Sequence, residues 1–290
     1  FKFERPVIIS GPCSCETEEQ MMETAQRLAD KGIHVLRAGI WKPRTRPGMF
    51  EGIGKEGLEW LVNAGKQIGK PTTVEVATGQ HVEDSLKAGV DILWIGARTT
   101  VNPFSVQEVA DALRGVDIPV LVKNPINPDL QLWLGSMERL NAVGITRLGA
   151  IHRGFSVYSH PKYRNVPNWE IPIGLKEQMP HIPMICDPSH ITGRRDLLRE
   201  VSQKAMDLNF DGLMIEVHPC PDEAWSDAAQ QITPDRLKEL FAALILRATH
   251  IEDSQVLQLE DVRAQIHSLD DKLFEILVDR MKLSEELGVF

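Results

Sequence analysis

Four side chains of the kinds that bind divalent metals lie far apart along this sequence of 290 residues: Cys13, His190, Glu216 and Asp227. A thiolate, an imidazole and two carboxylates suit a borderline ion such as Mn, Fe, Co or Zn, and they suit Mg or Ca poorly. Spacing alone does not select this interpretation, because a lone His is usually a packed residue and a buried Cys usually acts as a small hydrophobe. The sequence predicts a metal site if the fold brings the four residues together.

A second chemical group is basic, and its members are Arg37, Lys42, Arg44, Arg98, Lys123 and Arg153. The chain as a whole has a formal net charge of −9 and an isoelectric point near 5.5. Positive charge concentrated against that background predicts an anionic small-molecule ligand, and the forked guanidinium of Arg favours phosphate and carboxylate groups. The alternative for one or two of the six is an ordinary salt bridge at the rim of a domain.

Both groups follow short runs of β-branched residues bounded by turn signals, which predict strands. These strands are expected at residues 7–12, 34–39, 72–77, 92–97, 119–124, 145–151, 183–188 and 212–218. Helical segments are expected between and after them, among others at 17–31, 56–68, 80–88, 105–114, 195–208 and 234–249. Several strands are nearly all apolar, as in a parallel sheet covered on both faces. The pattern predicts an α/β fold, a (β/α)8 TIM barrel over residues 1–250.

A polar residue stands at or just beyond the carboxyl end of every predicted strand. In chain order these residues are Cys13, Arg37, Glu75, Arg98, Lys123, Arg153, Asp187 and Glu216. The site of a (β/α)8 barrel lies at this end of its strands, and in a closed barrel the last strand is a neighbour of the first. The fold therefore predicts that the basic group and the metal-binding group meet at one mouth.

Composition excludes several other classes of protein. Hydrophobic residues make up 42% of the chain and charged residues 25%, so a disordered or low-complexity chain is excluded. The sequence lacks an apolar run of the roughly 18 residues that a membrane span needs, and its net negative charge disfavours nucleic acid as a partner. The 4 cysteines do not form a disulfide framework, which favours a cytoplasmic location.

Eight strings, read together and in order, resemble those of one enzyme family. They are GPCS (11–14), LRAGIWKPRT (36–45), IGAR (95–98), LVKNP (121–125), HRG (152–154), CDPSH (186–190), LMIEVHP (213–219) and SDAAQQ (226–231). The chain resembles the short (type I beta) class of 3-deoxy-D-arabino-heptulosonate 7-phosphate (DAHP) synthases from residue 6 to about 250. The resemblance implies condensation of phosphoenolpyruvate with erythrose 4-phosphate and release of phosphate, the first step of the shikimate pathway.

The resemblance also implies roles for individual residues. The divalent metal would be held by Cys13, His190, Glu216 and Asp227. Phosphoenolpyruvate would be bound by Arg37, Lys42, Ala97, Arg98, Lys123 and Arg153, and erythrose 4-phosphate by Arg44 and Thr45. Lys42, Glu75, His190 and Asp227 would be the catalytic residues, with Glu75 or a metal-linked water handling the proton. One departure from the family pattern is Ala228, where Gly is usual.

The related octulosonate 8-phosphate synthases, which condense phosphoenolpyruvate with arabinose 5-phosphate, are the alternative for the barrel. They usually carry KANRS where this chain has KPRT at 42–45, so the sequence favours the DAHP synthases.

The last forty residues form a helical run without Gly or Pro until Gly288. Its three-four apolar spacing predicts a packing seam in which Arg280 takes one position. Residues 262–288 resemble the first helix of the all-helical chorismate mutases, with Arg263 and Arg280 on that family's two arginine positions. The two arginines are roughly 25 Å apart along one helix, so the resemblance implies a site shared between two chains and a homodimer or higher homo-oligomer. The sequence thus predicts a partial chorismate mutase domain at 251–290.

A fused mutase module would sense prephenate or chorismate as an effector of the barrel. The alternative is that the C-terminal helix serves only as a dimerisation or docking segment.

Overall fold

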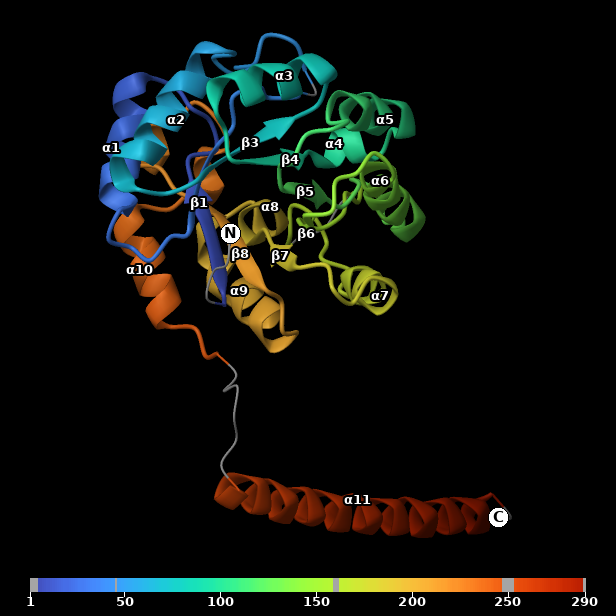
Figure 1. The fold of residues 1–290 in the computed structure, drawn as a ribbon. Coiled ribbons are helices and arrows are strands. Elements are labelled where there is room, and N and C mark those ends of the chain that lie inside the picture. The colour runs from blue at the N-terminus through green and yellow to red at the C-terminus, as the bar shows by residue number, and fades with distance from the viewer. Residues whose placement is uncertain (1–4, 45, 159–161, 247–252, 289–290) are drawn as a thin grey trace. The chain divides into compact units, whose positions relative to one another are not determined.

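In the computed structural model of the protein, the described residues are 5–44, 46–158, 162–246 and 253–288 (Figure 1). The chain divides into two compact units, Phe1–Leu246 and Arg247–Phe290. Among the described residues, no helix is both long and apolar enough to cross a membrane.

The first unit is a closed barrel of parallel strands in the order of the chain, from β1 next to β2 round to β8 next to β1. The strands are β1 Val7–Gly11, β2 Val35–Ala38, β3 Thr72–Val76, β4 Ile92–Ile95, β5 Val120–Lys123, β6 Leu148–His152, β7 Met184–Cys186 and β8 Gly212–Glu216. The predicted (β/α)8 barrel is confirmed, although β6 begins three residues later than expected.

Helices surround the barrel on the outside (Figure 1). They are α1 Glu18–Leu28, α2 Glu56–Ile68, α3 Gly79–Ala88, α4 Ala97–Thr100, α5 Pro103–Ala112, α6 Leu130–Ala142, α7 Glu170–Gln178, α8 Pro188–Thr192, α9 Leu198–Asp207 and α10 Pro234–Ala242, with the 3-10 turns η1 Arg195–Leu197, η2 Pro221–Glu223 and η3 Ala228–Gln230. Several begin at a residue whose side-chain oxygen accepts a hydrogen bond from the first turn, such as Thr17, Asn102 and Asp129. The predicted helix 234–249 is shorter than expected, because α10 ends at Ala242.

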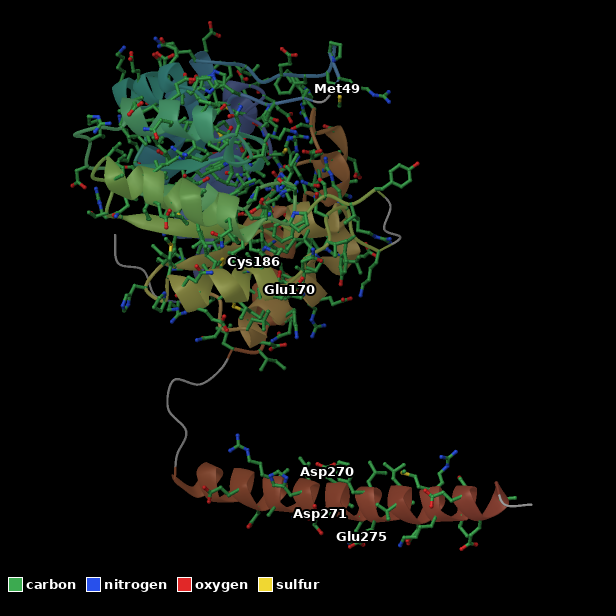
Figure 2. All side chains as sticks on the ribbon, turned by 90° about the vertical axis from the view of Figure 1, so that its right-hand side faces the viewer. Met49, Glu170, Cys186, Asp270, Asp271 and Glu275 are labelled. Atoms are coloured by element: carbon green, nitrogen blue, oxygen red, sulfur yellow. The ribbon has the colours of Figure 1, made fainter. Side chains whose placement is uncertain are left out.

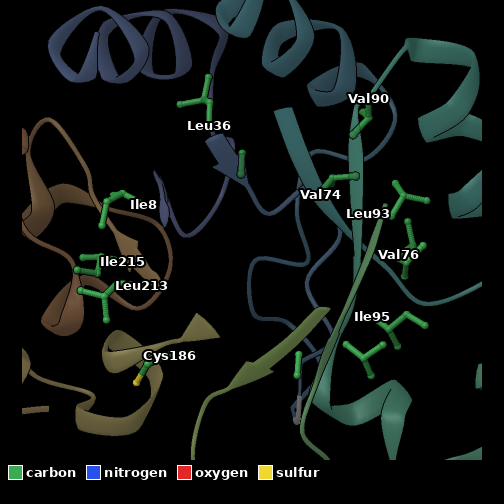
Figure 3. Close-up of a cluster of buried hydrophobic side chains, with 14 of the residues drawn as sticks. Ile8, Leu36, Val74, Val76, Val90, Leu93, Ile95, Cys186, Leu213 and Ile215 are labelled. Carbon is green, nitrogen blue, oxygen red and sulfur yellow. The ribbon is translucent and has the colours of Figure 1, made fainter. Parts of the chain in front are cut away.

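Two apolar layers hold the barrel together. The outer layer lies between strands and helices, and Figure 3 shows Ile8, Leu36, Val74 and Leu93 in it. The inner layer fills the barrel with Ile9, Val35, Ile92, Trp94, Ile151, Ile185 and Met214. Alternate residues of one strand therefore serve different layers, as the two-residue period of a strand requires. Because both faces are apolar, the strands appear in the sequence as continuous apolar runs.

The described residues of the second unit form the helix α11 Asp253–Leu287, which confirms the predicted long C-terminal helix. The apolar residues of its predicted seam, from Val262 to Leu287, are exposed by half or more in this single chain. Acidic side chains such as Asp270, Asp271 and Glu275 project from the same helix (Figure 2).

Candidate active site at the barrel mouth

The period of the strands decides which side chains reach the mouth. Six residues lie two positions after an apolar residue that contributes to the inner layer, and therefore point to the same side of the strand. The pairs are Val35 and Arg37, Ile92 and Trp94, Leu121 and Lys123, Ile151 and Arg153, Ile185 and Asp187, and Met214 and Glu216. Since the strands are parallel, these side chains gather at the carboxyl end of the barrel, where such barrels carry their sites.

Three of the four predicted metal ligands lie together at this end. One ligand atom from each of Cys13, Glu216 and Asp227 lies within 4.8 Å of the other two. The sulfur of Cys13 is 3.4 Å from Oδ2 of Asp227. β1 and β8 bring the cluster together, because Gly11 pairs with Glu216 in the barrel. The closure of the barrel therefore joins residues that are more than 200 positions apart.

His190, the fourth predicted ligand, lies beside this cluster but is not a member of it. Its Nε2 is 3.8 Å from Oε1 of Glu216, and its Nδ1 is 2.8 Å from Oδ2 of Asp187. Asp187 also caps α8, since its Oδ1 accepts the backbone N–H of His190 at 3.1 Å. A carboxylate at Nδ1 is the usual means of orienting a metal-binding imidazole, so Asp187 turns Nε2 towards the cluster.

The charge states of the cluster suit a cation. Burial and the charge of Glu216 raise the pKa of the Cys13 thiol to about 12. Burial alone would raise the pKa of Glu216 and of Asp227, but His190 and Arg37 lower that of Glu216, and Arg164 lowers that of Asp227. The carboxylates are thus ionised, while the thiol loses its proton only to a strong electrophile such as a metal.

One buried oxygen supports the fit to a divalent metal. Oε1 of Glu216 is fully buried, lies 3.2 Å from Nη1 of Arg37, and accepts no hydrogen bond of good geometry within the described residues. Asp227 adopts a positive φ of 47°, which a non-glycine residue rarely does and Asp tolerates better than most. The following Ala228 has no positive φ, so Ala fits where the family usually has Gly. The donors present suit Mn, Fe, Co or Zn.

All six predicted basic residues line one pocket of about 160 Å³ above this cluster. Among its described lining residues, seven are cationic and two, Glu75 and Asp227, are acidic. The cationic residues are Arg37, Lys42, Arg44, Arg98, Lys123, Arg153 and Arg164. The pocket therefore has a strong positive potential within a protein of negative net charge.

The deepest cations are held from two sides. Nη1 of Arg37 pairs with Oε1 of Glu216, and Nζ of Lys123 pairs with Oδ2 of Asp187 at 3.0 Å. The Trp94 ring lies beneath both, 5.0 Å from the Arg37 guanidinium carbon and 5.7 Å from Nζ of Lys123. Carboxylate and ring together fix the direction of each cation.

Lys42 connects the basic pocket to the thiol–carboxylate cluster. Its Nζ donates to the carbonyl oxygen of Cys13 at 2.8 Å and to the sulfur at 2.9 Å. Burial lowers the pKa of Lys42, but the charges of Cys13 and Glu216 outweigh it and leave the pKa above its usual value. Nearby, Nε of Arg44 donates to the carbonyl of Phe50 at 2.7 Å. Thr45, the other predicted erythrose 4-phosphate contact, lies outside the described residues.

Glu75 enters the pocket from β3 at a position fixed by two neighbours. Its Oε2 accepts a hydrogen bond from Nε1 of Trp94 at 2.8 Å. A Cβ at Gly96 would lie 2.1 Å from Oε1, so only glycine leaves room for this carboxylate. The next residue, Ala97, is buried, whereas Arg98 is exposed at the rim.

Arg153 is anchored by two asparagines. Its backbone N–H donates to Oδ1 of Asn124 at 2.7 Å, and its Nη1 donates to Oδ1 of Asn165 at 2.7 Å. Burial lowers the pKa of Arg153 to about 10, with Arg164 and Arg98 contributing, so the guanidinium remains protonated at neutral pH.

Arg164 is a pocket residue that the sequence analysis missed. It belongs to the loop between β6 and α7, well beyond a strand end, where no periodic pattern places it. His218, just beyond the end of β8, pairs with Glu16 at 3.3 Å and is not among the described lining residues of the pocket.

Taken together, a closed parallel barrel with clustered cations and a thiol–carboxylate group at its mouth defines a barrel enzyme for an anionic substrate. The comparison with protein families narrows this class. Residues 2–252 match the DAHP synthetase I family, and the chain belongs to that family. The predicted DAHP synthase resemblance is thereby confirmed at the level of the family, and the match ends before α11.

Individual relatives carry the names of both enzymes considered for the barrel, and the DAHP synthase is the more similar of the two that follow. The phospho-2-dehydro-3-deoxyheptonate aldolase of Thermotoga maritima is 36% identical over 233 residues, which are 80% of this chain and 67% of that protein. A 2-dehydro-3-deoxyphosphooctonate aldolase of Dechloromonas aromatica is 25% identical over 259 residues, 82% of this chain and 89% of that protein. The crystal structure of the T. maritima DAHP synthase matches with a TM-score of 0.73 at 33% identity, covering 81% of this chain and 67% of that one. A truncated form of the T. maritima enzyme matches with a TM-score of 0.70 at 31% identity, covering 81% and 84%.

Proposed function

We propose that the chain is a metal-dependent DAHP synthase, which condenses phosphoenolpyruvate with D-erythrose 4-phosphate and water to give 3-deoxy-D-arabino-heptulosonate 7-phosphate and phosphate. The observation that carries this proposal is the mouth pocket, where seven cationic side chains and Asp227, a member of the thiol–carboxylate cluster, line one cavity. Phosphoenolpyruvate brings a phosphate and a carboxylate, the groups that clustered guanidinium and ammonium ions bind.

In this proposal the cations position the enol and stabilise the departing phosphate. Arg37 and Lys123, fixed over Trp94, bind the deepest anionic group, and Lys42, Arg98 and Arg153 complete the phosphoenolpyruvate site. Because their partners already hold these cations in place, little reorganisation is needed when negative charge shifts to the phosphate. Arg44 and Thr45 extend the site towards the second phosphate, that of the sugar.

Cys13, Glu216 and Asp227, with His190 from the side, would hold the metal. A divalent ion there supplies Lewis acidity towards the aldehyde carbonyl of the sugar phosphate. Nδ1 of His190 lies 2.8 Å from the Asp187 carboxylate, so Nε2, which faces Glu216, would be the ligand atom. Glu75 is the pocket carboxylate outside this cluster, and it accepts the proton of the water that adds to the former enol carbon.

Direct assays test the proposed reaction and which sugar phosphate is its substrate. The protein is incubated with phosphoenolpyruvate and either erythrose 4-phosphate or arabinose 5-phosphate, with and without prolonged chelation. We expect turnover of erythrose 4-phosphate only, lost on chelation and restored by Mn²⁺ or Zn²⁺. Turnover of arabinose 5-phosphate alone would support the octulosonate alternative and overturn the proposal, and activity that survives chelation would overturn the metal site.

A matched pair of variants tests the basic pocket. Arg153→Gln removes a cation of the mouth, and Arg147→Gln removes one that precedes β6 at the other end of the barrel, where it pairs with Asp117 at 2.7 Å. We expect the first variant to raise KM for phosphoenolpyruvate at least tenfold and the second to leave it unchanged. Equal values of KM in both variants would contradict the proposed site.

The C-terminal helix supports a second proposal, that it is the first helix of a chorismate mutase module, which in the complete protein would convert chorismate to prephenate in a homo-oligomer and sense one of them as an effector. Its support is the seam of α11, in which the exposed Arg280 takes a position otherwise filled by apolar residues such as Ile276 and Leu283. Arg280→Ala in the full chain, measured for mutase activity, prephenate inhibition and oligomeric state, tests it. Loss of assembly, with no mutase activity in the parent, would favour the docking alternative.

A further inference from the structure

Gln230 is a fully buried residue that connects two carboxylates of the thiol–carboxylate cluster. Its Nε2 donates to Oε2 of Glu216 at 2.7 Å. Its Oε1 accepts a hydrogen bond from Nη1 of Arg164 at 2.8 Å, and the same Nη1 donates to Oδ1 of Asp227 at 3.0 Å. One amide group thus links Glu216, through Arg164, to Asp227.

The arrangement gives each carboxylate an outer and an inner oxygen. For Glu216, Oε2 is held by Gln230, whereas Oε1 accepts no hydrogen bond of good geometry within the described residues and lies 3.2 Å from Nη1 of Arg37 and 3.8 Å from Nε2 of His190. For Asp227, Oδ1 is held by Arg164, whereas Oδ2 lies 3.4 Å from the sulfur of Cys13. The outer oxygens are therefore held by Gln230 and Arg164, and each inner oxygen lies near another predicted ligand, His190 for Glu216 and Cys13 for Asp227.

The surroundings hold this bridge in one position. A Cβ at Gly193 would lie 2.6 Å from Cβ of Arg164, so glycine is needed for the arginine to lie there. The adjacent Asn165 donates to the carbonyl of His190 at 2.6 Å. The neighbouring Gln231 accepts the backbone N–H of Cys13 at 3.0 Å, which positions the third ligand.

We propose that Gln230 is a positioning residue of the metal site, which holds Glu216 directly and Asp227 through Arg164 so that one oxygen of each is presented to the ion. The inference rests on the proposed metal site and adds a residue that touches neither metal nor substrate. Removal of a residue that hydrogen-bonds a metal ligand typically reduces metal affinity or activity by about 10- to 100-fold.

The test is a cobalt titration of the metal-free protein, followed by the thiolate-to-cobalt charge-transfer absorption that coordination by Cys13 produces. Gln230→Met removes both amide contacts and keeps the length of the side chain. We expect it to bind Co²⁺ about 10- to 100-fold more weakly than the parent. The control is Gln20→Met, which removes another buried amide, one that bonds the Glu16 N–H and the Ser14 carbonyl, and it should leave the affinity unchanged.

The Co²⁺ titration tests the role of Gln230 separately from the proposed metal site. Equal Co²⁺ affinity in the parent and in Gln230→Met would overturn the role of Gln230 alone, whereas no charge-transfer band in the parent would overturn the Cys13 site and the inference with it. A lower thermal stability without metal, at unchanged affinity, would show a merely structural role and also overturn the inference.

If Gln230→Met does not fold, the same Co²⁺ titration is made with Arg164→Leu. The Arg164 side chain is half-exposed, so its replacement should not prevent folding. Positioning predicts weaker Co²⁺ binding in this variant. A role through charge alone predicts tighter binding, since a competing cation has been removed, and that result would overturn the inference.

Discussion

His152 makes the stability of the barrel depend on mild acid. Its ring is fully buried at the end of β6 among Phe155, Trp169 and Phe210, with ring centroids 5.8, 5.1 and 6.2 Å away. Burial and, to a lesser extent, the charge of Arg153 lower the pKa of His152 from 6.5 to about 3. The folded protein keeps this imidazole neutral at pH values where the unfolded chain protonates it.

The direction and magnitude of this pH dependence of stability follow from the different proton binding of the folded and unfolded chains. Between about pH 6.5 and pH 3 the unfolded chain binds one more proton than the folded chain at His152, so the free energy of unfolding falls as the pH falls. Each pH unit in this window costs about 1.4 kcal/mol. Between pH 7 and pH 5 the contribution of His152 is therefore a loss of about 2 kcal/mol.

The assay compares the parent with His152→Leu, an apolar side chain of similar size that does not titrate. Urea unfolding in chelator is followed by tryptophan fluorescence at pH 7 and pH 5, because all 6 tryptophans precede residue 247 and report on the barrel unit. Other titrating groups are common to both proteins and cancel in the comparison. We expect the parent to lose about 2 kcal/mol more than the variant. Equal losses would refute the argument that a buried neutral His152 sets this dependence.

Three further predictions concern the site. Asp187→Asn keeps the cap of α8 but leaves buried Lys123 without its anion. We expect the free energy of unfolding in urea to fall by about 3 kcal/mol. An unchanged unfolding midpoint would argue against the Lys123–Asp187 pair. Gly96→Ala places a Cβ in contact with Oε1 of Glu75; we expect kcat to fall at least tenfold with an unchanged circular dichroism spectrum, and full activity would contradict the role of Glu75. Cys13→Ser removes the thiolate, so Zn²⁺ should not restore activity to the chelated variant, whereas restoration to parental levels would exclude Cys13 as a ligand.

The barrel was predictable because every strand carries its own signal. Apolar runs covered on both faces mark the strands, and the differences from the prediction have local causes. Ile145 was assigned to the sixth strand for its apolar character, but it is buried behind the end of α6, where Gly144 has a positive φ and the Ile145 N–H bonds Leu140. Likewise the chain leaves α10 early, and the Ile245 N–H bonds Oε1 of Gln203 on α9.

The site was predictable only in part. Residues at strand ends, such as Arg37, Lys123 and Glu216, follow from the two-residue period once the direction of the strands is known. Arg164 and Gln230 could not be predicted in this way, because they lie in connecting segments between strands and helices. The positions of these segments depend on tertiary contacts such as those with Gly193 and Glu216.

The sequence by itself determined the eight strands, the mouth at which they end and the kinds of groups gathered there, because these follow from local periodicity and chain order. Only the tertiary structure decided which oxygen of each carboxylate faces inward and that Asp187 joins His190 to Lys123. The physical reason is that hydrogen bonds between distant segments select one side-chain orientation among several, and no local pattern in the sequence records that choice.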